Sequence, residues 1–251
     1  ITSENAEEVA ANGCARSTVK ETYEFILGDL NKAIELLANT KKTRSDKRYV
    51  SLDVAYGIRA RVHLTMHNYA DALKDAEAAL ASTSSVPYSS AAVSKPTFID
   101  IEDASWMWGI LITDKDRVST TGICNFPSHM GSLNYGYASV GGWRRISPKL
   151  YNQIPESDVR KGWFLDDTGV SVNLPAAAQA YITKKGAPVY TQVKYGPMND
   201  EWGSNNNATD VILMRVEEMY LIKAEAQAMN NDVSGGVNTL NSFVNTYRDP
   251  S

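Results

Sequence analysis

Two stretches of the sequence combine flat aromatic rings with hydrogen-bonding side chains at close spacing. The first, residues 134–145, has two tyrosines, one tryptophan and two arginines, interleaved with glycines that allow a loop to present them. An aromatic ring offers an apolar face to a ligand, while arginine and amide groups offer hydrogen bonds. We therefore predict a ligand-binding stretch here, with contacts made by Asn134, Tyr135, Tyr137, Trp143 and Arg144.

The second stretch, residues 200–207, is a polar tip with one aromatic residue, Trp202, which we also predict to contact ligand. A competing interpretation stays open for both stretches. Asparagine-rich turns are common for backbone reasons alone, and large aromatic residues are more often buried than ligand-binding. On that interpretation Trp143 only packs a loop onto the rest of the protein.

Catalytic arrangements are weaker candidates. His63 and His67 are four residues apart, the spacing that zinc proteases use on a helix, but Leu64 stands where the general-base glutamate would follow and no third ligand is evident. Glu217 and Glu218 are adjacent, and adjacent helix residues point about 100° apart, so they cannot face one bond together. The sequence also has no glycine-rich phosphate loop and no nucleophile signature. We predict no catalytic residue, no metal site and no cofactor.

The composition is that of a globular protein. Hydrophobic residues make up 43% and charged residues 22% of 251 residues, which argues against disorder and coiled coil. The net charge is −4 and there is no basic run, so we expect no nucleic-acid partner. Two cysteines cannot build a disulfide framework, and no apolar run approaches the ~18 residues of a membrane span.

Helical periodicity is clear before residue 81. Apolar residues recur at spacings of three and four over residues 19–37, which predicts an amphipathic helix, and Thr18 with Glu21 fits a capping box. Two further helices are predicted at about 51–66, with Ser51 as its cap, and at about 69–80. We expect them to form a tetratricopeptide-like hairpin, because Ala60, Ala72 and Ala79 are small residues 12 and 7 positions apart, which lets two antiparallel helices approach closely.

The middle of the chain differs in composition and lacks sustained periodicity. From about residue 83 to 209, Gly, Pro, Ser and Asn are frequent, and only short pieces at 105–113 and 148–153 keep a pattern. Helical order returns with a helix expected from Asp210 to Met229 and a partner at 233–247, with Ala224 and Gly236 at the same small-residue spacing. We predict a single domain over 1–251, mainly α, with tetratricopeptide-like helical hairpins at about 17–81 and 210–247 and a large irregular, loop-rich layer at about 83–209.

Four segments in order resemble the SusD/RagB family of outer-membrane nutrient-binding lipoproteins. They are residues 23–33, 55–72, 146–160 and 193–226, and the last is similar to the family's "K-Y … L-R-x-A-E-x-x-L-x-x-A-E-A" run. Val216 stands where the family usually has Ala, and Gly235 and Gly236 where an Ala is usual. The chain is about half the family's length and begins without Met, so we expect a fragment lacking N- and C-terminal parts.

The resemblance implies a non-catalytic protein at the cell surface that captures oligo- or polysaccharide and passes it to a TonB-dependent, SusC-like outer-membrane transporter. It also implies localisation at the outer membrane through a lipidated cysteine that lies outside this chain. An alternative stays open, in which the chain is a helical-repeat scaffold that binds another protein and no sugar. A sugar binder needs exposed aromatic rings beside a concavity, whereas a scaffold needs an exposed apolar groove on the helices between residues 19 and 80.

Overall fold

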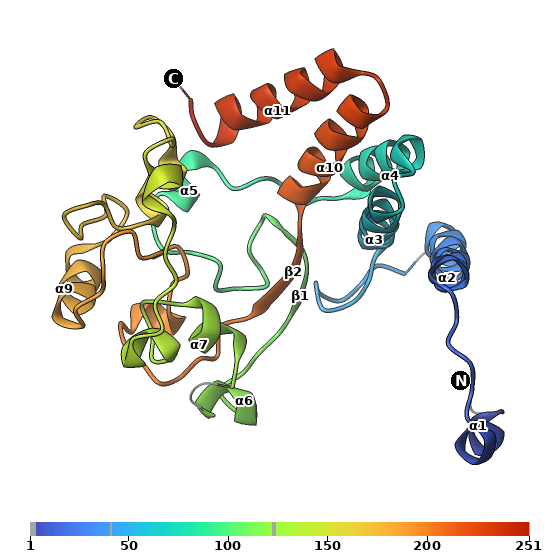
Figure 1. Cartoon of the computed structure of the whole chain (residues 1–251), viewed down its shortest axis with the longest axis horizontal. Coiled ribbons are helices and arrows are strands. Elements are labelled where there is room, and N and C mark those ends of the chain that lie inside the picture. The colour runs from blue at the N-terminus through green and yellow to red at the C-terminus, as the bar shows by residue number, and fades with distance from the viewer. Residues whose placement is uncertain (1–3, 41, 122–123, 251) are drawn as a thin grey trace.

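The computed structural model describes residues 4–40, 42–121 and 124–250, and it is mainly helical, as predicted (Figure 1). Long helices form the two ends of the sequence, and short elements fill the middle. No helix within the described ranges is long and apolar enough to cross a membrane. The elements are, in order, α1 (Ala6–Asn12), α2 (Val19–Asn39), α3 (Leu52–Thr65), α4 (Tyr69–Ser82), α5 (Ser90–Val93), β1 (Trp106–Ile110), α6 (Arg117–Thr120), α7 (Phe126–Met130), η1 (Tyr137–Val140), α8 (Pro148–Tyr151), η2 (Val159–Trp163), α9 (Ala176–Lys184), η3 (Met198–Asp200), β2 (Val211–Arg215), α10 (Val216–Met229) and α11 (Val233–Tyr247).

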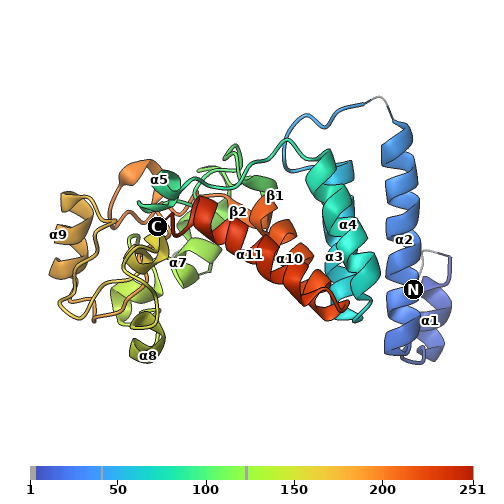
Figure 2. The same ribbon diagram turned by 90° about the horizontal axis from the view of Figure 1, so that it is seen from above.

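Helix α2 begins where its capping residues predict. The Thr18 hydroxyl accepts a hydrogen bond from the Glu21 backbone N–H at 3.2 Å, and the Thr18 N–H donates to the Glu21 carboxylate at 2.8 Å. These reciprocal bonds satisfy backbone donors that a helix start otherwise leaves unpaired. Only Ile34 of α2 is buried, and the helix lies at one end of the molecule against α3 (Figure 2).

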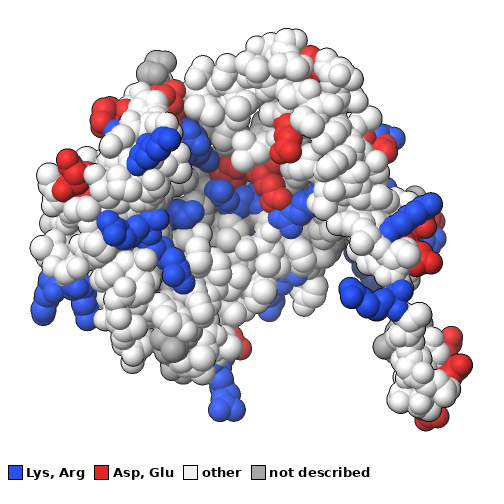
Figure 3. Space-filling view, viewed as in Figure 1, with Lys and Arg blue, Asp and Glu red and all other residues white. Residues whose placement is uncertain are grey.

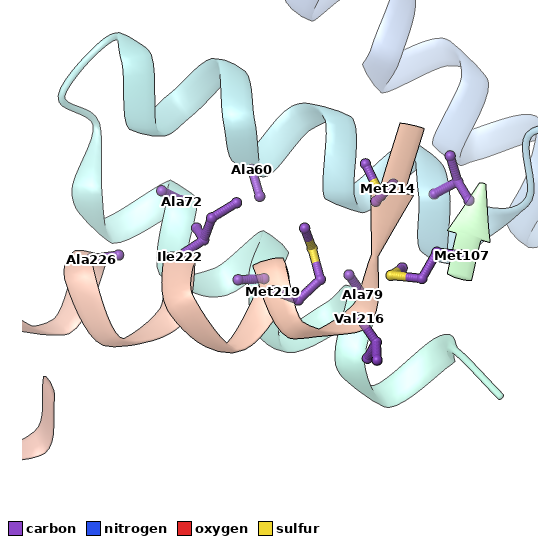
Figure 4. Close-up of a cluster of buried hydrophobic side chains, with 11 residues drawn as sticks. Ala60, Ala72, Ala79, Met107, Met214, Val216, Met219, Ile222 and Ala226 are labelled. Atoms are coloured by element: carbon purple, nitrogen blue, oxygen red, sulfur yellow. The ribbon is translucent and has the colours of Figure 1, made fainter. Parts of the chain in front are cut away.

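The helical core is built from α3, α4 and α10, which pack against one another. The three alanines predicted to allow close approach, Ala60, Ala72 and Ala79, are fully buried. Side chains of α10 and β2 fill the space between them, among them Met214 and Met219 (Figure 4). Small residues on one hairpin and flexible methionines facing it therefore give a close-packed interface.

Helices α10 and α11 also meet through small residues. A Cβ atom placed on Gly236 would lie 2.6 Å from the Ala224 carbonyl oxygen and 3.0 Å from the Ala228 backbone nitrogen. Backbone atoms cannot rotate away as a side chain can, so position 236 has no room for a methyl group. The predicted pairing of Ala224 with Gly236 is confirmed.

The expected helix start at Asp210 is wrong. Residues Val211–Arg215 form β2, which pairs antiparallel with β1 so that Trp106 lies opposite Arg215, and α10 begins only at Val216. The Asp210 carboxylate accepts hydrogen bonds from the backbone N–H groups of Ile101 and Ile112, each at 2.7 Å. The sequence of a short apolar run does not distinguish a helix from a strand. Here, hydrogen bonding to the distant strand β1 makes residues 211–215 a strand.

The loop-rich layer has small cores of its own. One cluster includes Tyr88, Phe98 and Trp106, and another includes Leu133 and Ile182. The layer lies beside the packed helices α2, α3, α4, α10 and α11, which we call the helical frame. It is joined to this frame through the β1–β2 pair (Figure 1). The nine-residue helix α9, which lies within it, has no clear counterpart in the sequence pattern.

Two Gly→Ala substitutions in helices should have opposite effects. Gly236→Ala should destabilise the fold by about 1–3 kcal/mol, because the added methyl overlaps backbone atoms of α10. Gly28→Ala, in exposed helix α2 with nothing within 4 Å of the new Cβ, should stabilise it by about 0.5–1 kcal/mol. Urea unfolding of both variants measures the difference, and equal effects would contradict the close packing of α10 on α11.

Candidate ligand-binding surface

The two stretches that the sequence singles out lie side by side. The Tyr135 N–H donates to the Ser204 carbonyl oxygen at 2.8 Å, and the Gly203 N–H donates to the Leu133 carbonyl oxygen at 2.7 Å. Residues 133–135 and 203–204 therefore run together although some seventy positions separate them. The structure joins two separately predicted candidates into one surface, which we call the aromatic surface and define as residues 134–144 together with 200–204.

Asn134 supports this surface from beneath. It is 4% exposed, and its side-chain amide donates to the Asn207 side-chain oxygen. The Asn207 amide in turn donates to the Tyr135 carbonyl oxygen at 3.2 Å. A buried amide engaged in this way holds two loops together and is not presented to a ligand.

Trp143 and Trp202 pack against the same hydrophobic cluster, which contains Leu133 and Ile182, and both indoles remain half-buried. The packing interpretation is therefore correct in part, and neither tryptophan is fully buried. An indole held in this manner loses little conformational freedom when a ligand stacks on it.

Tyr135, Tyr137 and Arg144 are also partly or fully accessible. The Tyr135 side chain is 40% exposed. Tyr137 is half-buried and contacts the His129 ring at a centroid distance of 4.7 Å, and the Arg144 Nε donates to the His129 carbonyl oxygen at 3.1 Å. Within the part of the chain that the structure describes, Arg144 makes no other side-chain hydrogen bond or ion pair, so its outer nitrogens can bind a ligand.

Sequence reasoning missed Tyr181. This residue comes from α9, and a Cβ atom on Gly203 would lie 2.4 Å from its ring, so the tyrosine packs directly on the loop that carries Trp202. Gly203 has φ +83°, which a residue with a side chain rarely adopts. Burial raises the pKa of the Tyr181 hydroxyl. Nothing in the local pattern of residues 176–184 marks Tyr181, because its role depends on a contact with a distant glycine.

A cavity of about 720 Å³ opens beside Trp202. It carries three carboxylates, Asp100, Asp103 and Asp200, and one lysine, Lys95. Asp100 and Asp103 each accept a hydrogen bond from a backbone N–H two residues further along the chain, at 2.8 and 3.1 Å, which orients their oxygens. We call this hollow the Trp202 cavity. No sequence motif marks residues 95–103 as part of a ligand site, since acidic residues in loops are common.

Metal binding finds no support in the described ranges, which contain no group of three or more His, Cys, Asp or Glu residues placed to hold an ion. The Nε2 atom of His63 lies 3.8 Å from the Asp75 carboxylate, and the ring of His67 stacks on Tyr69. The carboxylates of Glu217 and Glu218 bind Arg248 and Arg61, respectively.

The molecule is thus a frame of paired helices that carries a loop-rich layer with a half-exposed aromatic surface. Comparisons with protein-family models and with curated proteins found no match. Among solved structures, the chain is similar to a SusD-like carbohydrate binding protein from Bacteroides vulgatus, with 26% identity, a TM-score of 0.71, and coverage of 95% of this chain and 45% of that one.

Two further structures agree on the fold. A SusD superfamily protein from Bacteroides thetaiotaomicron has 20% identity and a TM-score of 0.69, with coverage of 93% of this chain and 48% of that one. A surface glycan-binding protein A from the same organism, in complex with laminarihexaose, has 17% identity and a TM-score of 0.57, with coverage of 89% and 53%. The chain has the SusD-like fold, and the resemblance to the SusD/RagB family is confirmed. It spans about half the length of the solved structures it matches.

Replacing the buried amide should destabilise the two loops. Asn134→Ala should cost about 1–3 kcal/mol in the free energy of unfolding, because the buried Asn207 oxygen loses a donor. Asn205→Ala, at an exposed position in the same loop, should change it by less than about 0.5 kcal/mol. Chemical denaturation compares the variants, and an Asn134→Ala protein as stable as Asn205→Ala would refute the supporting role.

Proposed function

We propose that this protein binds oligo- or polysaccharide non-catalytically at the aromatic surface and the adjoining Trp202 cavity. The observation that carries the proposal is the position of Trp202, a half-buried indole that belongs to both. The solved structures with this fold include proteins described as carbohydrate binding and glycan-binding, which supports the same class of ligand here.

The chemistry of the site suits a sugar. A pyranose ring has an apolar C–H face that stacks on an indole or phenol ring, and hydroxyl groups at its edge that donate to carboxylates and accept from guanidinium groups. The Trp202 cavity supplies the carboxylates, and the aromatic surface supplies Tyr135 and Arg144 beside the indoles. Concave sites with few oriented polar groups are the usual form of small-ligand sites.

A binding role is favoured over hydrolysis by the state of the acidic residues. The adjacent pair Glu217 and Glu218 is engaged by arginines, so neither carboxyl is free to donate a proton or to attack a glycosidic bond. In the Trp202 cavity, Asp100 and Asp103 accept backbone hydrogen bonds, which orient their carboxylate oxygens as acceptors for sugar hydroxyls.

We also propose that the protein acts at the cell surface, anchored to the outer membrane by a lipid outside this chain, and passes glycan to a TonB-dependent transporter. The family resemblance supports this step. A second observation favours a protein partner at the helical end. Helix α2 exposes Val19, Phe25 and Leu36, each more than half accessible, and a hollow of about 790 Å³ between α2 and α3 is lined in part by Leu36 and Tyr49.

This exposed helical end is also the feature that the alternative, a protein-binding scaffold without a sugar ligand, requires. The two functions do not exclude one another, because the hollow at α2 and the Trp202 cavity share no lining residue. They differ in what each predicts for the aromatic surface, which a scaffold would not need.

Trp202→Ala should weaken oligosaccharide binding by about 1–3 kcal/mol, the loss expected for one stacked aromatic contact, and Trp143→Ala should weaken it by a similar amount. A glycan array identifies the ligand, and isothermal titration measures affinity. Tyr49→Ala, at an exposed tyrosine in the α2 hollow, is the matched control and should bind sugar as the unmodified protein does. Unchanged affinity in both tryptophan variants would contradict the proposal.

Docking to a transporter predicts a defect at the opposite end. Phe25→Asp should reduce co-purification of an outer-membrane transporter when the full-length protein is expressed in its host, because a charge replaces an exposed apolar contact on α2. Leu150→Asp, at a 54% exposed position in α8 of the loop-rich layer, serves as control. Recovery of no transporter with the unmodified protein would speak against the partner.

A further inference from the structure

A second hollow, of about 290 Å³, lies where the loop-rich layer meets β2 and the first turn of α10. Its aromatic walls are Phe98, Trp163 and Tyr195, and its two cationic residues are Lys194 and Arg215. Figure 3 shows the molecule hollowed between the C-terminal helices and the loop-rich layer, with charged residues of both signs gathered there. We call this hollow the Lys194 pocket. The proposed sugar-binding surface does not use it.

The Lys194 ammonium is surrounded by aromatic faces. Its Nζ lies 4.9 Å from the centroid of the Tyr195 ring, 5.5 Å from that of Trp163 and 5.7 Å from that of Phe98. Over the described ranges this ammonium has no hydrogen bond and no carboxylate partner. Cation–π contacts hold it in place but do not neutralise its charge.

Arg215 is the second cation, and its hydrogen-bonding capacity is also unfilled. Its guanidinium lies 4.9 Å from the centroid of the Phe98 ring, and its Nη1 atom is buried without a hydrogen-bond acceptor in the described structure. The nearest carboxylate contact is Glu217 Oε1 at 3.5 Å, which is longer than a charge-assisted hydrogen bond.

The acidic residues of the pocket are committed elsewhere. The Glu217 carboxylate accepts from the Tyr88 N–H at 2.9 Å and the Ser105 hydroxyl at 2.7 Å, and it pairs with Arg248 at 3.2 Å. The Glu218 carboxylate accepts from the Arg61 guanidinium at 2.6 Å. Each glutamate thus has an arginine of its own.

Lys194 and Arg215 therefore remain as an excess of two positive charges. Burial lowers the pKa of Lys194, and the neighbouring positive charge of Arg215 lowers it further. Two poorly compensated cations facing one cavity are stabilised by an entering anion, because it supplies both the missing charge and the missing acceptor.

We propose that the Lys194 pocket binds the anionic group, carboxylate or sulfate, of an acidic glycan, with Lys194 and Arg215 contacting that group and the Trp163 and Tyr195 rings contacting the sugar. The glycan part of this inference rests on the proposed function. The volume falls just below the usual range for ligand sites of about 300–1,000 Å³, so the pocket suits one acidic sugar residue rather than a length of chain.

The first test compares acidic and neutral ligands at constant ionic strength. Isothermal titration uses a galacturonate oligosaccharide, a sulfated carrageenan oligosaccharide and neutral laminarihexaose. Lys194→Gln should lower affinity for the acidic ligand at least tenfold and leave neutral binding unchanged, and Lys194→Arg should restore most of it. Lys149→Gln, at an exposed lysine in α8, is the matched control. The galacturonate and carrageenan arms distinguish a carboxylate from a sulfate, and equal losses in Lys194→Gln and Lys149→Gln would overturn the pocket.

The second test probes the pocket without relying on glycan binding. Glucuronate and inorganic sulfate are titrated separately into the protein while the NMR signal of the Lys194 side-chain Cε is followed. A saturable shift at Lys194 that is absent at Lys149 supports the pocket, even if no oligosaccharide binds. A shift at Lys194 without any oligosaccharide binding would overturn the proposed function but not the pocket. No shift together with binding of laminarihexaose alone would overturn the pocket and leave the proposed function standing.

Discussion

The buried carboxylate of Glu217 is the interaction on which the arrangement of the molecule depends. It is 2% exposed, and from the first turn of α10 it binds three separate segments, through the Tyr88 N–H, the Ser105 hydroxyl and Arg248. These partners lie after α4, before β1 and after α11. Separating Arg248 from Glu217 would leave a buried charge uncompensated, which is costly. The bonds of Glu217 therefore hold the helical frame and the loop-rich layer together.

This constraint also explains the charge pattern around it. Because Glu217 is committed to Arg248, it only partly compensates Arg215, which ends β2 and lies over the Tyr88 and Phe98 rings. The positive character of the Lys194 pocket is thus a consequence of how the helical frame is joined to the loops. The Trp202 cavity, lined by three aspartates and one lysine, carries instead an excess of negative charge.

The sequence predicted what depends on local periodicity. Helix α2 with its capping box, the α3–α4 hairpin and the Ala224–Gly236 contact follow from spacings of three, four and twelve residues, and the structure confirms them. The sequence pattern does not identify strand β2, because its partner, β1, lies over one hundred residues away. The burial of Asn134 and the contribution of Tyr181 were missed for the same reason, since each is decided by contacts between distant loops.

The Trp202 cavity and the Lys194 pocket share a wall, the segment at residues 95–100. Thr97 and Ile99 line the former, and Phe98 lines the latter. Backbone hydrogen bonds to Lys194 and Gly196, at 2.8 and 2.9 Å, hold the segment, and Phe98 adopts φ +64°, an unfavourable conformation for a bulky side chain. Such a conformation persists only where the surroundings over-determine it. The conformation of this wall therefore does not depend on a ligand, and the two hollows that we propose as ligand sites lie on either side of one segment and differ in the sign of their charge.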